Sequence, residues 1–423
     1  MRGASRASRH RLAATRLNMT ALAAVLLAAG CGSSSSGSSP SSRTPTSVAG
    51  PAHGAAPNVA PPADYTAWPE AERSVRHSSQ ATAKGPQSVH LRWKAALGAA
   101  TTEGPSVGSD GTIYESTDRG VLHAIDPRTG KDRWTYDGQG PIGGDLSTTA
   151  AVLPDGRIAW PGPRHTLFGL SPSGHVLWTV ALGGVPLSPV VAGGGTLYVM
   201  TTSGELSAVQ VSASSAAPRW TIKLGKTSFG SPAIGPDGTV LTTVDNSLVK
   251  VRDNGGSGKQ LWRFSVAKQV EVSPAVSPTG VTILGTDDGF EYGVSAVGKQ
   301  LWKHPINTFS YSSPAVADDG TAYFGDNKGA LTVVDSSNGT VARTVNATPG
   351  AATPGNIWTA PLIDSAGDVY YGTNDGHVYG FAATGSMLFD LSTGKTVASY
   401  PALTSDGGLL IGSDDGYLYD IGQ

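Results

Sequence analysis

The chain repeats a short pattern with a period of about forty residues, and a fixed period constrains its fold more than any other feature. The pattern is Ser/Thr-Pro-small-aliphatic followed by a glycine-containing turn, and its sharpest copies begin at Ser231, Ser273 and Ser313. Looser copies have their proline position at residues 105, 150, 189, 361 and 401. In all eight copies a turn dipeptide such as Asp237-Gly238 begins five residues later. Asp-Gly between apolar runs indicates a β-hairpin, because glycine adopts the positive φ that such turns need.

Each repeat has room for four short strands. The turn precedes a β-rich run such as 369–371, and a second turn and a third strand such as 378–381 follow. The fourth strand carries a tryptophan in five repeats, namely Trp134, Trp178, Trp220, Trp262 and Trp302. Arg343 and Phe389 hold the equivalent places in the sixth and seventh repeats. Four short strands per repeat predict an all-β fold, an eight-bladed β-propeller of four-stranded antiparallel blades.

The two ends of the repeat region complement each other. The eighth repeat has no tryptophan strand, whereas an extra one at residues 91–94 precedes the first repeat. Its Trp93 lies 41 residues before Trp134, in phase with the other repeats. We therefore expect the N-terminal strand to complete the last blade and to close the ring, which leaves no open sheet edge between the ends. The propeller then spans residues 91–423 and follows a lead-in segment at residues 63–90.

The first 62 residues resemble a targeting and tethering region. Five arginines precede an apolar stretch at residues 19–29 that is too short to span a bilayer, and small residues lead up to Cys31, the one cysteine of the chain. Residues 1–31 therefore resemble a bacterial lipoprotein signal, which predicts that Cys31 is lipidated and anchors an extracytoplasmic protein to the cell envelope. The alternative is an ordinary cleaved signal that leaves a free thiol. Residues 32–62 are mostly Ser, Gly, Ala and Pro and predict a disordered tether.

The link before the first of the repeat tryptophans carries the sharpest motif. Residues 124–134 read Ala-Ile-Asp-Pro-Arg-Thr-Gly-Lys-Asp-Arg-Trp. They resemble the tryptophan-docking motif of propellers with pyrroloquinoline-quinone (PQQ) repeats, Ala-x-Asp-x-x-Thr-Gly-Lys-x-x-Trp. Trp68-Pro69 and residues 76–78 are similar to the lead-in of many such proteins. Because a buried indole supplies a large contact area, Trp93 and the five later tryptophans are expected to pack between blades.

Two groups of proteins share this resemblance, and fold alone does not choose between them. One group is the quinoprotein alcohol dehydrogenases, and the other is noncatalytic lipoproteins such as the propeller subunit of the outer-membrane β-barrel assembly machinery. Resemblance to the dehydrogenases implies PQQ, a Ca²⁺ site of Glu, Asn and Asp, a catalytic Asp and, in many members, a disulfide between adjacent cysteines. One cysteine cannot form that disulfide, and repeats this short leave little room for the insertions that wall a cofactor pocket. We therefore expect no catalytic residues, no PQQ, and no calcium or other metal.

The acidic pairs Asp287-Asp288 and Asp414-Asp415 could be read as oxygen ligands for calcium. Both pairs precede a glycine and recur with the hairpins. They are therefore expected to serve the turns themselves.

A candidate binding site comes from the position three residues before each proline position. In the fourth to seventh repeats this position holds Phe229, Glu271, Tyr311 and Trp358. The resemblance implies that this segment lies at one mouth of the central funnel. Aromatic rings around one carboxylate suit an extended peptide, a sugar face or a cationic group. The alternative is that these side chains fold inward and plug the funnel.

The function expected from the sequence is a noncatalytic, monomeric envelope lipoprotein whose propeller binds a protein, a peptide or a glycan. A ligand-sensing lipoprotein that serves a transporter or signalling partner is one alternative, and a PQQ- and calcium-dependent alcohol or sugar dehydrogenase is another. A net charge of −2 offers no basic footprint for nucleic acid. Lipid is expected to be the one link to a membrane.

The lipid anchor is tested by replacing Cys31 with serine. The Cys31→Ser protein is expected to move from the membrane fraction to the medium or periplasm, because a serine hydroxyl does not receive the lipid. Cell fractionation followed by immunoblotting measures this shift. Retention at the membrane after the substitution would contradict the anchor.

Overall fold

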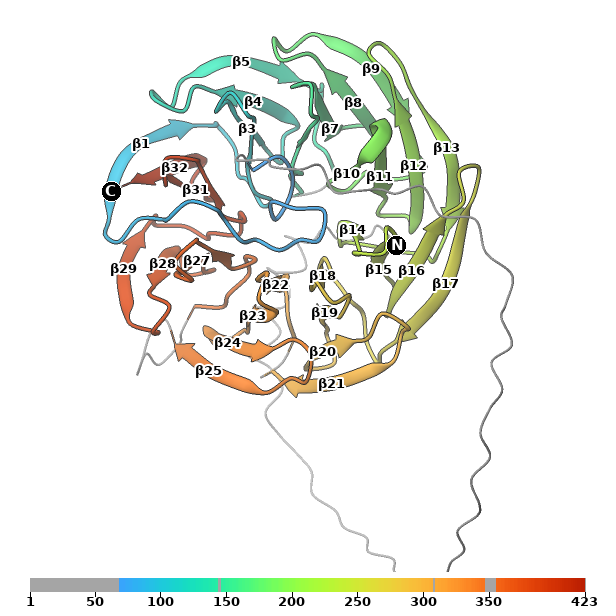
Figure 1. Ribbon diagram of the computed structural model, residues 1–423. Coiled ribbons are helices and arrows are strands. Elements are labelled where there is room, and N and C mark those ends of the chain that lie inside the picture. Colours follow the sequence, from blue (N-terminus) through green and yellow to red (C-terminus); the bar gives the residue numbers. More distant parts are fainter. Residues whose placement is uncertain (1–67, 144–145, 307–308, 347–354, 423) are drawn as a thin grey trace, which may run out of the picture.

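The computed structural model describes residues 68–143, 146–306, 309–346 and 355–422. The predicted signal, Cys31 and the predicted tether lie outside these ranges. Within them the strands form eight four-stranded antiparallel sheets arranged as a ring (Figure 1). The predicted eight-bladed β-propeller is thus confirmed. Among the described residues, no helix has the length and apolar character needed to cross a membrane.

The blades are numbered in chain order, and their first strands lie nearest the centre of the ring (Figure 1). Blade 1 contains β2 (Ser106–Val107), β3 (Ile113–Ser116), β4 (Val121–Ile125) and β5 (Asp132–Asp137). Blade 2 contains β6 (Ala151–Val152), β7 (Ile158–Gly162), β8 (Thr166–Leu170) and β9 (Val176–Ala181). Blade 3 contains β10 (Val190–Ala192), the short 3₁₀ turn η1 (Gly193–Gly195), β11 (Thr196–Met200), β12 (Glu205–Val211) and β13 (Ala216–Lys223). Blade 4 contains β14 (Ala233–Ile234), β15 (Val240–Val244), β16 (Ser247–Asp253) and β17 (Gly258–Ser265).

The second half of the ring repeats this arrangement. Blade 5 contains β18 (Ala275–Val276), β19 (Thr282–Gly285), β20 (Phe290–Val294) and β21 (Gln300–Pro305). Blade 6 contains β22 (Ala315–Val316), β23 (Thr321–Gly325), β24 (Ala330–Asp335) and β25 (Val341–Asn346). Blade 7 contains β26 (Leu362–Ile363), β27 (Val369–Gly372), β28 (His377–Phe381) and β29 (Met387–Ser392). Blade 8 contains β30 (Ala402–Leu403), β31 (Leu409–Gly412), β32 (Tyr417–Gly422) and the N-terminal strand β1 (His90–Ala96).

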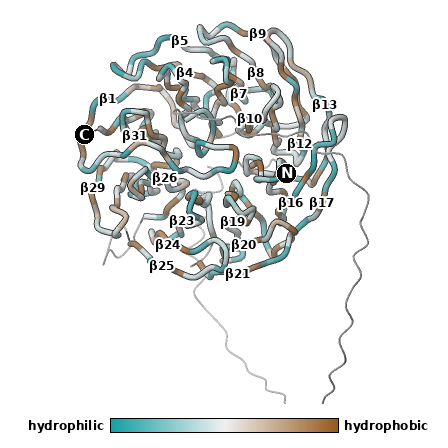
Figure 2. The backbone as a smooth tube through the Cα atoms, viewed as in Figure 1, coloured by the Kyte–Doolittle hydropathy of each residue, from teal (hydrophilic) through white to brown (hydrophobic). Residues whose placement is uncertain are grey.

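The hydrophobic core lies in layers between neighbouring blades. Successive side chains of a strand point to opposite faces of its sheet, so each blade contributes to two layers. Ala233 of β14 packs with Val276 of blade 5, whereas the next residue, Ile234, packs with Tyr198 of blade 3. Along the chain, hydrophobic and hydrophilic stretches alternate within the blades (Figure 2). A fold built in this way must close, because an open ring would expose the faces of its first and last blades to water.

The ring closes as the sequence predicts. Strand β1 pairs antiparallel with β32, with Leu91 opposite Ile421 and Lys94 opposite Tyr419. A β-bulge between Leu91 and Trp93 shifts the register within this pair. The first and last parts of the propeller therefore share one sheet, as Figure 1 shows in blue and red.

The lead-in segment crosses one end of the central channel (blue, Figure 1) and binds the inner strands of six blades. Five of its backbone carbonyls accept hydrogen bonds of 2.5–2.9 Å from inner-strand N–H groups; the pairs are Trp68–Val107, Pro69–Val152, Val75–Ile234, Arg76–Val276 and Ser79–Ile363. In blade 3 a side chain replaces the carbonyl, since Glu70 Oε2 accepts from the Val191 N–H at 2.9 Å. Trp68 and His77 are buried. The lead-in segment thus closes this end of the channel.

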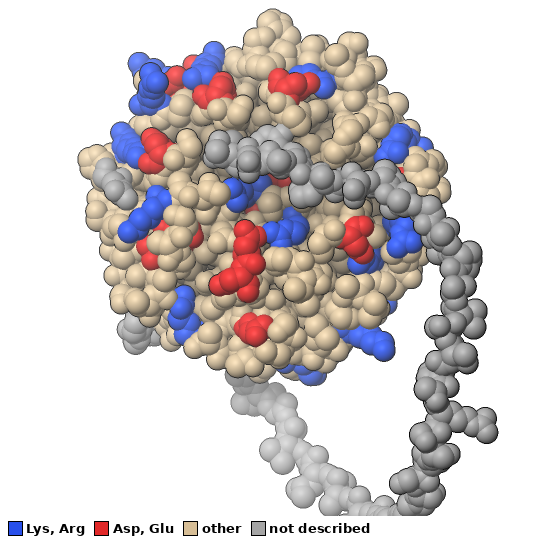
Figure 3. Space-filling view, in the orientation of Figure 1, with Lys and Arg blue, Asp and Glu red and all other residues tan. Residues whose placement is uncertain are grey.

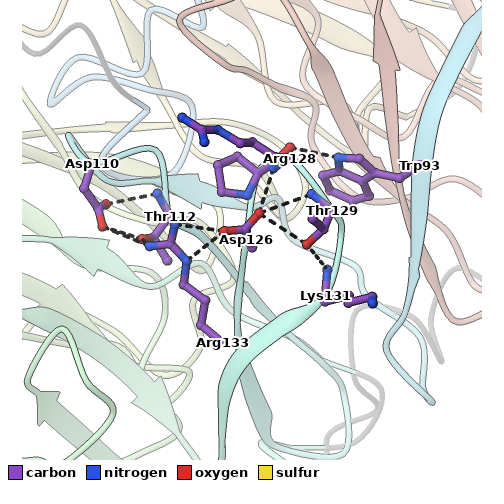
Figure 4. Close-up of polar contacts among 9 residues, drawn as sticks. Trp93, Asp110, Thr112, Asp126, Arg128, Thr129, Lys131 and Arg133 are labelled. Carbon is purple, nitrogen blue, oxygen red and sulfur yellow. Dashed lines mark hydrogen bonds and ion pairs between the residues drawn. The ribbon is translucent and has the colours of Figure 1, made fainter.

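The outer-strand tryptophans lie between adjacent blades. The Trp93 ring packs on Gly130 of blade 1, and its Nε1–H donates to the Pro127 carbonyl at 2.9 Å (Figure 4). Gly130 has φ +65°, and a Cβ there would lie 2.6 Å from the Trp93 ring, so both conformation and space require glycine. Four other tryptophans donate to the next blade at 2.8–3.1 Å; the pairs are Trp134–Pro172, Trp220–Asp253, Trp262–Ala296 and Trp302–Ser336. Trp178 packs on Gly169 of its own blade, and its Nε1–H has no partner among the described residues.

Trp93→Ala tests the closure of the ring. It is expected to lower the free energy of unfolding by about 3 kcal/mol, close to the loss for Trp262→Ala, because each ring fills a junction between two blades. Denaturant unfolding at equilibrium measures both losses. Trp93→Phe serves as the control, since it keeps an aromatic ring and removes the hydrogen bond. A silent Trp93→Ala would contradict a closing role for β1.

Candidate functional site

The four sequence-predicted residues lie toward the end of the channel that is opposite the lead-in segment. The lead-in segment binds the C-terminal residue of most inner strands it reaches, whereas the predicted residues precede those strands by several positions. Phe229 precedes β14, Glu271 precedes β18, Tyr311 precedes β22 and Trp358 precedes β26. We call this end of the channel the mouth.

All four side chains are buried, with relative exposures of 9% for Phe229, 3% for Glu271, 6% for Tyr311 and 9% for Trp358. The structure brings Tyr311 and Trp358 together, with ring centroids 6.3 Å apart in an edge-to-face arrangement. Phe309 extends this group, because its ring centroid lies 4.7 Å from that of Tyr311. In this conformation the aromatic rings fill space at the mouth, and a partner would meet them together with the loops that surround them.

A chain of hydrogen bonds around the channel explains the serine of the repeat motif. The N–H of Ser231 donates to Ser273 Oγ at 3.0 Å, and the N–H of Ser273 donates to Ser313 Oγ at 3.2 Å. Each serine thus satisfies a backbone amide of the preceding blade. In blade 8 a tyrosine takes the serine position, and the Tyr400 hydroxyl lies 3.1 Å from Ser313 Oγ. The sequence analysis did not single out Tyr400, although its place directly before Pro401 was a usable signal.

The second aspartate of each pair bonds within its own hairpin, and Asp288 also accepts from the Ala267 N–H at 3.3 Å. Asp288 accepts a hydrogen bond from the Tyr292 hydroxyl at 3.0 Å. Asp415 accepts from the Tyr417 N–H at 3.1 Å and from the Tyr419 hydroxyl at 2.5 Å. Among the described residues, no three His, Cys, Asp or Glu side chains lie close enough together to hold a metal ion. The described residues and the single cysteine therefore do not supply the metal site and the disulfide that a resemblance to the dehydrogenases implies.

Buried carboxyl groups lie in the lead-in segment and in blade 5. Burial raises the pKa of Glu70 in the lead-in segment to about 8, although the Val191 N–H opposes the shift. Burial also raises the pKa of Glu291 in β20 to about 8, although the nearby Ser310 hydroxyl opposes the shift. Burial lowers the pKa of His77 to about 4, and its Nδ1 donates to the Pro274 carbonyl at 3.0 Å. Near neutral pH both acids are therefore largely protonated and His77 is neutral.

The surface around the closed end carries both signs of charge. In Figure 3, which shows one face of the molecule, acidic and basic side chains are interspersed. Some of them pair directly, such as Arg76 of the lead-in segment with Asp318 at 2.5 Å. This face therefore offers no uniform field that would select a strongly charged partner.

Comparison with known proteins establishes the family. The sequence family described as outer membrane protein assembly factor BamB matches residues 79–159, 164–308 and 254–422. The chain belongs to this family. The match covers nearly all of the propeller and confirms the resemblance to PQQ-repeat propellers. None of the curated proteins matches the chain.

Solved structures that resemble this BamB-family chain share its fold at low sequence identity. BamB from Moraxella catarrhalis is 16% identical with a TM-score of 0.62, and the match covers 79% of this chain and 98% of that one. Quinohemoprotein alcohol dehydrogenase from Comamonas testosteroni is 14% identical with a TM-score of 0.67, and the match covers 85% of this chain and 81% of that one. Sqt1 from Saccharomyces cerevisiae is 12% identical with a TM-score of 0.64, and the match covers 81% of this chain and 100% of that one. Structures this distant in sequence show the fold alone.

The buried acids predict how stability depends on pH. A glutamate in the unfolded chain titrates near its ordinary value of 4.5, whereas Glu70 and Glu291 hold their protons to about pH 8 in the folded state. The contribution of these two glutamates to the stability of the fold is fully present below pH 4.5 and is lost as the pH rises through 8. His77 has the opposite sign, because its lowered pKa removes stability as the pH falls from 6.5 through 4.

The thermal midpoint is therefore expected to fall between pH 6.5 and 9, a window in which His77 contributes little. The double variant Glu70→Gln/Glu291→Gln is expected to flatten this slope, because glutamine has no proton to lose. Differential scanning fluorimetry across the pH range measures both proteins. The matched control is Glu205→Gln, which alters a partly exposed acid that faces Lys223. If the thermal midpoint changed equally with pH in all three proteins, the inference that Glu70 and Glu291 are protonated in the folded state would be contradicted.

Proposed function

We propose that this chain is a noncatalytic binding module of the bacterial cell envelope that holds a protein, a peptide or a glycan at the mouth of its channel. The observation that carries the proposal is that the lead-in segment closes the other end of the channel. A partner that uses the channel then has one approach, through the loops around Phe229, Glu271, Tyr311 and Trp358. The family description, which concerns the assembly of outer membrane proteins, supports an envelope location.

The composition of the mouth favours a partner with both apolar and cationic groups. Aromatic side chains are frequent anchors at protein interfaces, because they bury a large area with little loss of conformational freedom. Tyr311 and Trp358 supply such rings in blades 6 and 7, and Glu271 supplies a carboxyl group in blade 5. A lysine or arginine side chain in an extended peptide matches this combination. A sugar face against the rings is the other ligand that the mouth suits.

The noncatalytic part of the proposal is independent of the partner. It is supported by the missing disulfide and by the lack of a metal-holding group among the described residues. Reduction of an electron-acceptor dye by the purified protein with PQQ, Ca²⁺ and an alcohol or aldose would overturn it.

The binding site is tested with the double variant Glu271→Ala/Trp358→Ala. It is expected to reduce partner capture roughly tenfold or more, because two anchors at the mouth are lost together. Cross-linking in intact cells followed by mass spectrometry measures capture, and thermal unfolding measures stability. Trp262→Ala is the control, since it weakens a blade junction at the outer rim without altering the mouth. Unchanged capture with lower stability in the double variant would show that Glu271 and Trp358 belong to the core.

A further inference from the structure

A groove at the seam of the ring, between blade 8 and blade 1, is larger than an equivalent groove elsewhere. Its volume is about 620 Å³, compared with about 200 Å³ for the groove between blades 3 and 4. Val107 contributes to its wall and bonds to the Trp68 carbonyl, so the groove lies toward the end that the lead-in segment closes. It is thus separate from the mouth.

The difference in volume follows from one arginine position. In blade 3 the residue before the outer-strand tryptophan is Arg219, which reaches across to Asp253 of blade 4 at 2.6 Å. The Tyr198 hydroxyl bonds to the same carboxylate at 2.9 Å, and together these contacts close the smaller groove.

At the seam the equivalent residue, Arg92, bonds back to Asp406 of its own blade at 3.0 Å. At the position equivalent to Asp253, blade 1 has Pro127, which offers Trp93 a backbone carbonyl and has no carboxylate. The preceding residue, Asp126, is an acid, but Arg133 of the same blade pairs with it at 3.1 Å (Figure 4). Neither ion pair crosses the seam. The seam groove is therefore left open.

The groove is lined by side chains that suit an anion with hydroxyl groups. Its walls include His90, Arg92, Trp93, Ser109, Arg128 and Ser405, and also Asp406, which pairs with Arg92. Figure 4 shows the Arg128 guanidinium outside the hydrogen-bond network. Among the described residues its side chain has no hydrogen-bond or ion-pair partner, although its backbone N–H bonds to Asp126. The pair of Arg92 with Asp406 involves a carboxylate that is 70% exposed, and such surface pairs contribute little.

We propose that the seam groove binds an acidic saccharide of about disaccharide size. The volume falls in the range of about 300–1,000 Å³ that is common for small-ligand sites. A guanidinium fork fits a carboxylate with two parallel hydrogen bonds, which Arg128 can supply. Arg92 adds positive charge nearby, while both of its terminal nitrogens donate to Asp406. The half-buried Trp93 ring offers an apolar wall for a sugar face, and the serine hydroxyls can bond to its hydroxyl groups. The Trp93 ring and the serine hydroxyls favour a saccharide over an acidic peptide, because they match a sugar face and its hydroxyl groups.

The test is calorimetric titration of the detergent-solubilised full-length protein with digalacturonate, with neutral lactose as the comparison. Digalacturonate is expected to bind and lactose is not, because the arginines recognise the carboxylates. Arg128→Gln should weaken binding roughly tenfold, the effect expected when a charge-assisted contact is lost. Ser405→Trp should abolish binding by filling the groove. Arg252→Gln is the matched control, since Arg252 lines the smaller groove and its loss should leave binding unchanged.

Three results would overturn the proposal. The first is equal binding of lactose, which would remove the role of charge. The second is binding that neither Arg128→Gln nor Ser405→Trp alters, or no binding at all. The third is binding of poly-aspartate without binding of digalacturonate, which would assign the groove to an acidic peptide. Because the groove and the mouth lie at different ends of the blades, Glu271→Ala/Trp358→Ala should leave digalacturonate binding unchanged, and failure of either proposal does not affect the other.

Discussion

The innermost strand of each blade has one unpaired edge, and the ring arrangement turns these inner edges toward one central channel. An inner strand such as β14 pairs with β15 on one side only, so its other edge presents free N–H and C=O groups. Backbone groups buried without a partner cost free energy, and water has limited access to a closed channel. The lead-in segment answers this constraint at one end, where carbonyls from Trp68 to Ser79 accept the inner-edge N–H groups. The hydrogen bonds that pair these inner-strand N–H groups therefore also hold the lead-in segment across the end of the channel.

A second constraint acts at the outer rim, where blades must dock without a continuous sheet between them. The indole of Trp93 meets this need with a broad ring on Gly130 and one directed hydrogen bond to Pro127. The contact tolerates variation, because Trp220 donates to the Asp253 carboxylate where most of the others use a carbonyl. Replacement of the carbonyl by a carboxylate also recruits Arg219 and closes the neighbouring groove. Small changes in the docking link thus decide how much space remains between two blades.

Much of this architecture was readable from the sequence, because it repeats. The period of the Ser-Pro motif and the phase of Trp93 predicted eight blades and their closure, and β1 pairs with β32 as expected. The role of the lead-in segment was not readable, since Arg76 meets Val276 from a distant part of the sequence and no periodic pattern marks the contact. The exposure of Glu271 and Trp358 was also beyond the sequence, because spacing places a residue near the mouth without fixing the direction of its side chain. In the structure both side chains are buried.

The positions where function is proposed are those where the repeats stop being equivalent. A symmetric ring would present the same side chain eight times around the channel and the same groove eight times around the rim. Here the mouth is aromatic in blades 6 and 7, and Tyr400 reaches from blade 8 to Ser313 of blade 6 across the place that a serine holds elsewhere. The seam is distinct because Arg92 and Arg133 both turn to carboxylates of their own blades. The fold requires only that neighbouring blades pack together and that the backbone groups of the inner strand edges have hydrogen-bond partners. Side chains that differ between repeats without weakening these contacts can therefore determine which ligand binds.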